Sequence, residues 1–216
     1  EAMAKQWVYD FSEGDGKNKH LLGGKGANLC EMTQIGLNVP PGFVITTEAC
    51  LSYLDDEDHN LPEGIMEEVR GHMARVEDAT GKTFGGVDDP LLVSVRSGSA
   101  MSMPGMMDTI LNLGLNDDTL KGLIKQSGDE RFGFDAYRRF IQLFGKVALG
   151  VSDEAFDEEF EAVKEKAGVK SDVGLSARDL KEISDRFLDV VERETGKPFP
   201  EDPFEQLEIA VKAVFN

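Results

Sequence analysis

The chain has 216 residues and a formal net charge of −18, because 41 Asp and Glu residues outweigh 23 Lys and Arg residues. This excess of negative charge argues against polyanionic partners, namely nucleic acid and anionic membrane surfaces. No apolar run approaches the length of a transmembrane span. The length is sufficient for one large domain or two small ones.

The first half of the chain divides into short strands and helices. A short apolar or alternating run predicts each strand, and a 3.6-residue period predicts each helix. In chain order we expect a strand over 7–11, a helix over 24–36, a strand over 42–46, a helix over 48–54 capped by Thr46 or Thr47, a helix over 61–76 and a strand over 91–96. Residues 78–90 are expected to form a loop.

After Gly114 the pattern becomes helical. We expect helices over 117–127, 131–149, 153–167, 176–194 and 203–216, and Ser176 and Asp179 have the spacing of a capping box. The expected fold class is α+β, with an α/β subdomain over 1–114 followed by a helical subdomain over 115–200. The apolar helix over 203–216 has no terminating signal, so we expect the natural chain to continue. We also expect this helix to return to the first subdomain.

A glycine-rich segment around Lys25 is the first candidate for binding an anion. Residues 21–32 read Leu-Leu-Gly-Gly-Lys-Gly-Ala-Asn-Leu-Cys-Glu-Met, a glycine loop that continues into the predicted helix. Lys25 would then lie at a helix N-terminus, where free N–H groups and the helix dipole favour an anion. The segment is not a Walker A loop, since Gly26 follows the lysine where that motif requires Ser or Thr. The alternative is an exposed lysine without a ligand.

The second candidate is the end of the predicted strand 91–96. Arg96 is followed by the small residues Ser-Gly-Ser-Ala, which leave the backbone accessible, and Pro104-Gly105 is a turn signal. A guanidinium beside such a loop suits a polyphosphate, because it can bind two oxygens at once while backbone N–H groups bind others. The alternative role for Arg96 is an ion pair with an aspartate of the core.

The rest of this loop contains methionines at positions 101, 103, 106 and 107. Their spacing is typical of core residues, but the Pro-Gly turn between them also suits a mobile lid over bound nucleotide. Asp108 is expected to cap a helical segment over 109–113, with a magnesium ligand as the alternative.

Four motifs carry a resemblance to a known family. They read Leu-Leu-Gly-Gly-Lys-Gly-Ala-Asn-Leu from Leu21, Val-Pro-Pro-Gly-Phe-Val-Ile-Thr-Thr-Glu-Ala-Cys from Val39, Asp-Pro-Leu-Leu-Val-Ser-Val-Arg-Ser-Gly from Asp89 and Ser-Met-Pro-Gly-Met-Met-Asp-Thr-Ile-Leu-Asn-Leu-Gly from Ser102. Together they resemble the pyruvate phosphate dikinase family, and the methionine-rich motif is highly specific. The similarity runs from near Lys5 to the last residue and covers the N-terminal part of that family's nucleotide-binding region.

The resemblance implies an ATP-grasp-like subdomain with a mixed sheet, interrupted by a helical subdomain, and an incomplete ATP-grasp. The ATP-binding residues that it implies are Lys25, Arg96, Gly98, Ser102, Met103, Gly105 and Thr109. It implies no catalytic residue in this chain, because the family's carrier histidine lies in another domain, in a Gly-Gly-x-Thr-x-His context that this sequence lacks. The ligands of Mg²⁺ are expected mostly outside the chain.

The resemblance also implies a reaction and partners. The family interconverts ATP, phosphate and pyruvate with AMP, pyrophosphate and phosphoenolpyruvate through a phosphohistidine. This chain would bind ATP for the first half-reaction and would not catalyse the overall reaction alone. The implied partners are the second ATP-grasp half, the phosphohistidine domain and the pyruvate-binding barrel of the same chain, and the full-length enzyme is expected to be a homodimer.

Two other functions stay open on the sequence. One is the nucleotide-binding part of a phosphoenolpyruvate synthase, against which the Met-Pro-Gly-Met-Met-Asp motif discriminates. The other is a non-catalytic nucleotide-binding module. Cys30 and Cys50 are the two cysteines, and we expect both to be reduced, which suits an intracellular protein of the cytoplasm or an organelle.

Overall fold

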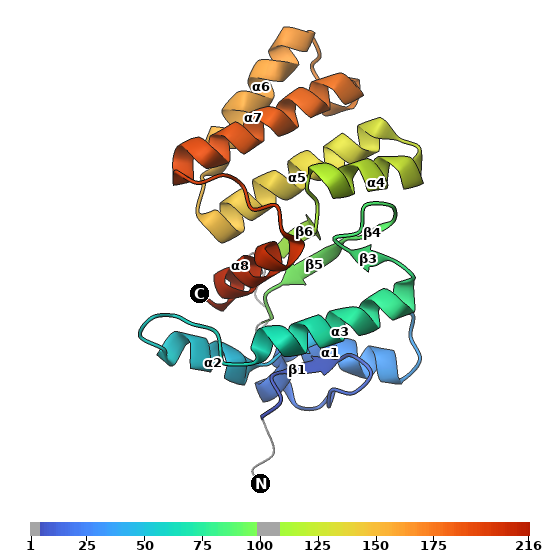
Figure 1. The fold of residues 1–216 in the computed structure, drawn as a ribbon, viewed down its shortest axis with the longest axis vertical. Coiled ribbons are helices and arrows are strands. Elements are labelled where there is room, and N and C mark those ends of the chain that lie inside the picture. The colour runs from blue at the N-terminus through green and yellow to red at the C-terminus, as the bar shows by residue number, and fades with distance from the viewer. Residues whose placement is uncertain (1–4, 99–108) are drawn as a thin grey trace. The chain divides into compact units, whose positions relative to one another are not determined.

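The computed structural model describes residues 5–98 and 109–216, and its fold is α+β, as expected (Figure 1). The described strands form three two-stranded sheets, β1–β2, β3–β4 and β5–β6. The single mixed sheet that we expected is therefore not present in the described part of the chain, because each short strand pairs with one neighbour only.

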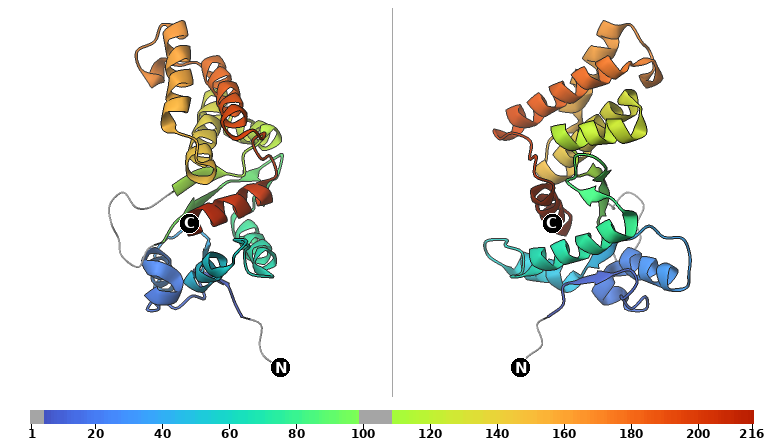
Figure 2. Two further views of the ribbon diagram at one scale, coloured as in Figure 1. Left: turned by 90° about the vertical axis from the view of Figure 1, so that its left-hand side faces the viewer. Right: turned by 45° about the vertical axis from the view of Figure 1, so that its right-hand side comes forward.

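Figures 1 and 2 show the described elements from three directions. In chain order they are β1 (Val8–Asp10), α1 (Lys19–Gln34), β2 (Phe43–Ile45), α2 (Thr47–Asp55), α3 (Ile65–Thr80), β3 (Thr83–Phe84), β4 (Pro90–Leu91), β5 (Val93–Arg96), β6 (Thr109–Leu113), α4 (Asp117–Ser127), α5 (Glu130–Leu149), α6 (Asp153–Ala167), a 3-10 turn (Asp172–Gly174), α7 (Ala177–Thr195) and α8 (Pro203–Phe215).

The described residues fall into two compact units. The first unit comprises the described residues within 1–81, 96–108 and 215–216. The second unit comprises residues 82–95 and 109–214. The boundary passes through β5, between Val95 and Arg96. The division into domains over 1–114 and 115–200 stays a prediction.

The first unit contains the antiparallel pair β1–β2, in which Val8 lies opposite Ile45. Both strands were expected from their apolar pattern. Helix α3 contacts β1, and its buried face includes Val69. Thr46 caps α2, since its side chain accepts a hydrogen bond from the N–H of Ala49 at 3.2 Å. Of the two alternatives for this cap, Thr46 is therefore the correct one.

Helix α1 differs from its prediction around the glycines. It was expected over 24–36, but it begins at Lys19, after the cap Asn18, and ends at Gln34. Gly23 has φ 73° and ψ 165°, which is not helical, so α1 consists of two helical segments joined at Gly23. The first segment is missed by the sequence pattern because Leu-Leu-Gly-Gly has the composition of a loop.

The second segment of α1 packs closely on β2 because Gly26 has no side chain. A Cβ atom at Gly26 would lie 2.8 Å from Cγ1 of Val44, well inside the optimal separation of two carbon atoms. Leu22, Ala27 and Cys30 of α1 are buried with Val44 in the same cluster. This cluster is the hydrophobic core beneath the glycine segment.

Aromatic side chains form much of the core of the second unit. Phe156 of α6 and Phe187 of α7 have ring centroids 5.0 Å apart, and Phe140 of α5 lies 5.5 Å from Phe199. Edge-to-face pairs of this kind add to the free energy gained from burial. The first pair joins α6 to α7, the second joins α5 to the segment after α7, and α5 also contacts α7 directly.

The expected helices of the second unit are confirmed, with boundaries that agree within a few residues. The capping box before α7 is also confirmed. The N–H of Asp179 donates to Oγ of Ser176 at 3.1 Å, and the N–H of Ser176 donates to Oδ2 of Asp179 at 3.0 Å.

A buried glutamine joins α8 to the turn that follows β6. Oε1 of Gln206 accepts from the N–H of Gly114 at 3.0 Å, and Nε2 donates to the carbonyls of Leu115 at 3.0 Å and Pro200 at 2.8 Å. A buried amide requires such partners. The first turn of α8 is therefore fixed to the turn after β6 by polar contacts as well as by packing.

Residues 109–113 form a strand, so the helical segment expected after Asp108 is wrong. β6 pairs with β5, and the buried Ile110 alternates with the exposed Leu111, which is the period of a strand. Pairing with β5 thus outweighs the local capping signal.

Two other segments also differ from the sequence prediction or escape it. Within the expected loop 78–90, Thr83 and Phe84 form β3, which pairs in parallel with β4 at the end of that loop, with Thr83 opposite Pro90. The predicted methionine lid and Asp108 lie outside the described residues.

The two cysteines are free thiols, as expected. Burial raises the pKa of both, Cys30 and Cys50, so the thiol form is favoured. Among the helices that the structure describes, none combines the length and the apolar character needed to cross a membrane.

Gly26→Ala should destabilise the first unit, because the added methyl group would overlap Val44. Overpacking of this kind costs about 1–3 kcal/mol. Trp7 is the sole tryptophan and lies in the first unit, so urea denaturation followed by its fluorescence reports the stability of that unit. Gly71→Ala is the matched control, since a Cβ at this position in α3 meets nothing within 4 Å. The urea concentration at the midpoint of its unfolding should not fall below that of the parent chain. Equal midpoints for Gly26→Ala and the parent chain would contradict the close packing.

Candidate functional site

Lys25 lies in the first turn of the second segment of α1, shortly after Gly23. Its side chain is exposed, and it forms no ion pair with another described residue. N–H groups in the first turn of a helical segment lack partners within the helix, and the dipole is positive there. Lys17 and Lys19 lie nearby in sequence, and no acidic residue occurs over 16–30. The segment is therefore locally basic.

Arg96 is the last residue of β5, and its side chain is exposed. Val93 and Val95 are half-buried and alternate with it, so Arg96 points away from the packed face of the strand. The alternative role, an ion pair with a core aspartate, is not observed between Arg96 and any described residue. Its guanidinium is thus accessible to a ligand.

The backbones of Gly23 and Gly98 lie next to each other in the first unit. A Cβ atom at Gly23 would lie 3.5 Å from the carbonyl oxygen of Gly98 and 3.8 Å from its Cα. Lys25 closely follows Gly23, and Arg96 closely precedes Gly98. The contact therefore brings together the two segments that the sequence singled out.

The other predicted ATP-binding residues are less informative. Thr109 begins β6 in the second unit and is half-buried. Ser102, Met103 and Gly105 lie outside the described residues.

A separate polar cluster, which sequence reasoning missed, connects β1 to α3. Oδ1 of Asp10 lies 2.5 Å from Nδ1 of His72, and Oδ2 accepts a hydrogen bond from Nη1 of Arg75 at 2.5 Å. Oε1 of Glu13 accepts from the backbone N–H of Asp10 at 2.9 Å. The side chains of His72 and Asp10 are only 9% and 14% exposed. No local pattern indicates this cluster, because Asp10 and His72 are 62 positions apart.

The cluster holds Asp10 in its ionised form. Burial raises the pKa of this carboxyl, but the hydrogen bonds and charges of His72 and Arg75 lower it, and the resulting pKa is below its ordinary value. The carboxylate therefore acts as an anchor between β1 and α3.

The same cluster is a poor site for the Mg²⁺ that the resemblance implies. Asp10, Glu13 and His72 each place one potential ligand atom within 4.8 Å of the others. However, Nη1 of Arg75 lies 2.5 Å from Oδ2 of Asp10 and 3.8 Å from Oε1 of Glu13. Mg²⁺ prefers oxygen ligands and ordered water, whereas this cluster offers an imidazole and already contains a cation. The residues do not fit Mg²⁺.

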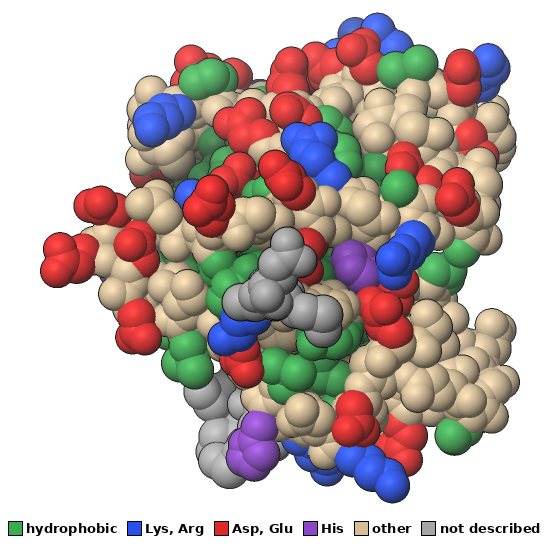
Figure 3. Space-filling model, turned by 60° about the horizontal axis from the view of Figure 1, so that its bottom comes forward, with side chains coloured by type: hydrophobic (Ala, Val, Ile, Leu, Met, Phe, Trp, Pro, Cys, Tyr) green, Lys and Arg blue, Asp and Glu red, His purple; other side chains and the backbone are tan. Residues whose placement is uncertain are grey.

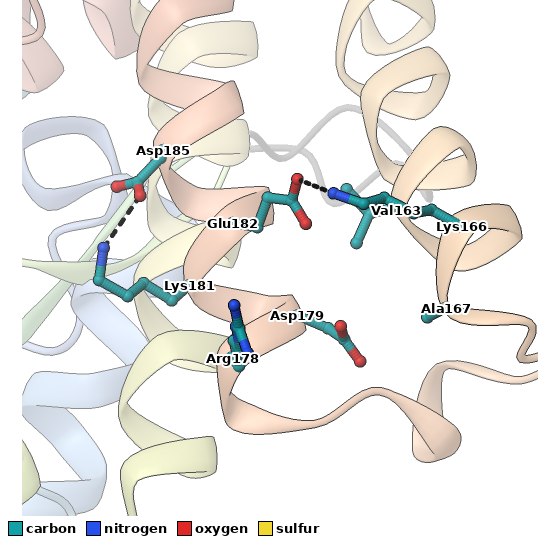
Figure 4. A pocket seen from close by; sticks show the side chains of 8 residues that line it. All are labelled: Val163, Lys166, Ala167, Arg178, Asp179, Lys181, Glu182 and Asp185. Carbon is teal, nitrogen blue, oxygen red and sulfur yellow. Dashed lines mark hydrogen bonds and ion pairs between the residues drawn. The ribbon is translucent and has the colours of Figure 1, made fainter.

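An open groove of about 490 Å³ lies between α6 and α7 in the second unit (Figure 4). Four of its charged side chains are already paired: Lys166 Nζ lies 3.0 Å from Glu182 Oε1, and Lys181 Nζ lies 3.0 Å from Asp185 Oδ2. Small-molecule sites are mostly apolar with a few convergent polar groups. The groove lacks these features.

Comparison with known proteins agrees with the four sequence motifs. Pyruvate, phosphate dikinase of Entamoeba histolytica is 58% identical over 98% of this chain, the chloroplastic pyruvate, phosphate dikinase 1 of Zea mays is 52% identical over 98%, and the Clostridium symbiosum protein of the same name is 49% identical over 99%. The predicted resemblance to pyruvate phosphate dikinase is confirmed. Residues 19–65 also match the family model described as "Pyruvate phosphate dikinase, AMP/ATP-binding domain".

The chain spans about a quarter of the length of these pyruvate phosphate dikinases, namely 24%, 23% and 24%. Lys25 and Gly23 lie within the residues that match the AMP/ATP-binding model, and Arg96 lies beyond them. The similarity therefore concerns a nucleotide-binding region rather than a whole dikinase.

Asp10→Asn should destabilise the first unit and make its stability less sensitive to acid. The variant removes the carboxylate that lies 2.5 Å from both His72 and Arg75, and loss of a buried partner costs about 1–3 kcal/mol. Because the folded-state pKa of Asp10 is lowered, its contribution is complete above the unfolded pKa of about 3.9 and is lost as the pH falls through the folded-state value. The difference in the free energy of unfolding between the parent chain and the variant should be largest at neutral pH and should decrease below about pH 3.9.

Urea denaturation followed by Trp7 fluorescence, at neutral and acid pH, measures this difference. Asp58→Asn is the control, because Asp58 is exposed in the loop after α2, and it should behave like the parent chain. A difference for Asp10→Asn that stays constant across this pH range would contradict an ionic origin.

Proposed function

We propose that this chain is the N-terminal part of the ATP-binding region of a pyruvate phosphate dikinase. The observation that carries the proposal is the 58% identity to the Entamoeba histolytica dikinase over 98% of the chain. Two exposed cations, Lys25 and Arg96, on segments joined by the Gly23–Gly98 contact support it. We infer an ATP-grasp-like subdomain with a helical insertion over 115–200, which a second ATP-grasp half elsewhere in the full-length protein completes.

In the full-length enzyme the chain would bind ATP for the first half-reaction. The proposed overall reaction converts ATP, phosphate and pyruvate into AMP, pyrophosphate and phosphoenolpyruvate, with a histidine of another domain as the phosphoryl carrier. Phosphoryl transfer depends mainly on positioning and charge neutralisation. This chain would therefore contribute without supplying a covalent catalyst.

The proposed roles follow from the chemistry of the two cations. Lys25 supplies a compact charge to a phosphate, and Arg96 supplies a planar fork that binds two phosphate oxygens. Gly98, Ser102, Met103, Gly105 and Thr109 are proposed to line the same nucleotide.

Other components of the reaction are proposed to lie outside this chain. Most of the Mg²⁺ ligands are proposed to lie outside this chain, because the Asp10 cluster does not fit the ion. The second ATP-grasp half, the phosphohistidine domain and the pyruvate-binding barrel complete the enzyme, which we propose to act as a homodimer with phosphate as co-substrate. The proposed compartment is the cytoplasm or an organelle; the maize relative is named chloroplastic.

In the full-length enzyme, Arg96→Lys should slow phosphorylation of the carrier histidine by ATP. Lysine keeps the charge but loses the fork, and a charge-assisted hydrogen bond is worth about 1.5–3 kcal/mol, which corresponds to a loss of roughly 10- to 100-fold in rate. Single-turnover phosphorylation by labelled ATP measures the first half-reaction. Exchange of labelled pyruvate into phosphoenolpyruvate measures the second, which should be unchanged.

Arg178→Lys is the matched control, because Arg178 is exposed on α7, and both half-reactions should stay at the parent rate. Equal losses in both half-reactions for Arg96→Lys would point to a folding defect. An unchanged rate of histidine phosphorylation would overturn the proposed role of Arg96.

A further inference from the structure

Gly23 has a backbone conformation that is almost restricted to glycine. Its φ of 73° and ψ of 165° interrupt an otherwise helical run, and this region of positive φ with ψ near 180° is essentially closed to residues with a side chain. Gly23 is also buried. Glycine adopts it at no steric cost, so the restriction applies to any residue that replaces Gly23.

This conformation redirects the chain within α1. The segment before Gly23 begins at Lys19, and the segment after it carries Lys25. Successive residues of a helix rotate by about 100° around its axis, so a continuous helix from Lys19 would present Lys25 in another direction. The position of Lys25 therefore depends on Gly23.

The redirected backbone lies against the strand end that carries Arg96. A Cβ atom at Gly23 would lie 3.5 Å from O, 3.6 Å from C and 3.8 Å from Cα of Gly98. Contacts at these distances are ordinary packing, so space alone would not exclude alanine at Gly23. The backbone conformation is what requires glycine.

We propose that Gly23 is a positioning residue for phosphoryl transfer from ATP, because its glycine-only turn sets the place of Lys25 relative to Arg96. This inference rests on the proposed function. Gly23 differs from Gly26, whose absent side chain makes room for a neighbouring strand. It also differs from Gly36, which follows the end of α1 with φ 91° and where a Cβ atom would meet nothing within 4 Å.

The test compares Gly23→Ala with Gly36→Ala in the full-length enzyme. Both variants strain a backbone of positive φ in the first unit, but only Gly23 contacts Gly98. Gly23→Ala should lower kcat for histidine phosphorylation by at least about tenfold, because misplacement of a binding group by 1 Å can cost about 100-fold. The KM for ATP should change less, and pyruvate exchange should not change. Gly36→Ala should match the parent enzyme in all three.

A double-mutant cycle with Arg96→Lys separates positioning from a loss of stability. If Gly23 acts by placing Lys25 against Arg96, the double variant should be about as slow as the slower single variant. Effects that simply multiply would overturn the inference. If Arg96→Lys alone has no effect, the proposed function fails; if Arg96→Lys slows the reaction and Gly23→Ala does not, only this inference fails.

A d-alanine in place of Gly23 keeps the test decisive if Gly23→Ala does not fold. A d-residue adopts positive φ without the strain that an l-residue meets. It can be introduced by ligating a synthetic segment that ends at Leu29 to one that begins at Cys30. This enzyme should retain histidine phosphorylation near the parent rate, and a loss confined to that half-reaction would overturn the inference.

Discussion

The first unit depends on how closely the backbone of α1 approaches its neighbours. Gly26 leaves room for Val44, and Gly23 turns the chain toward Gly98. A side chain at Gly26 would overlap Val44, and a side chain at Gly23 would not tolerate the backbone conformation that precedes Lys25. Core packing and the geometry of the candidate site are therefore set by the same short segment.

The strong negative charge of the chain is compatible with a phosphate ligand because the glycine segment itself has no Asp or Glu over 16–30. On the face shown in Figure 3, carboxylates are spread over the surface rather than gathered in one patch. Several carboxylates of the chain are neutralised locally, as where Arg186 contacts Glu159 at 2.9 Å. Salt screens exposed charges beyond about 8 Å at physiological ionic strength. The lysines of the glycine segment can thus set the local potential there.

Features that act over a few residues could be predicted from the sequence. The capping box of Ser176 and Asp179 and the cap at Thr46 depend on side chains that reach only the next turn. Features made by distant residues could not. Asp10 and His72 meet across 62 positions, and the strand β6 exists because β5 lies beside it, against a local signal for a helix.

The candidate site lies between these two cases. The sequence indicates Lys25 and Arg96 as residue types suited to phosphate, and it indicates that the residues beside them are small. The sequence does not show why these neighbouring residues are small, because the pattern Gly-Gly-Lys-Gly predicts only a loop before a helix. In the structure the helical N-terminus beside Lys25 is created inside α1, by the backbone of Gly23. The same backbone lies against Gly98, a residue far along the chain, so local composition identifies the candidate cations while tertiary packing determines how they are presented.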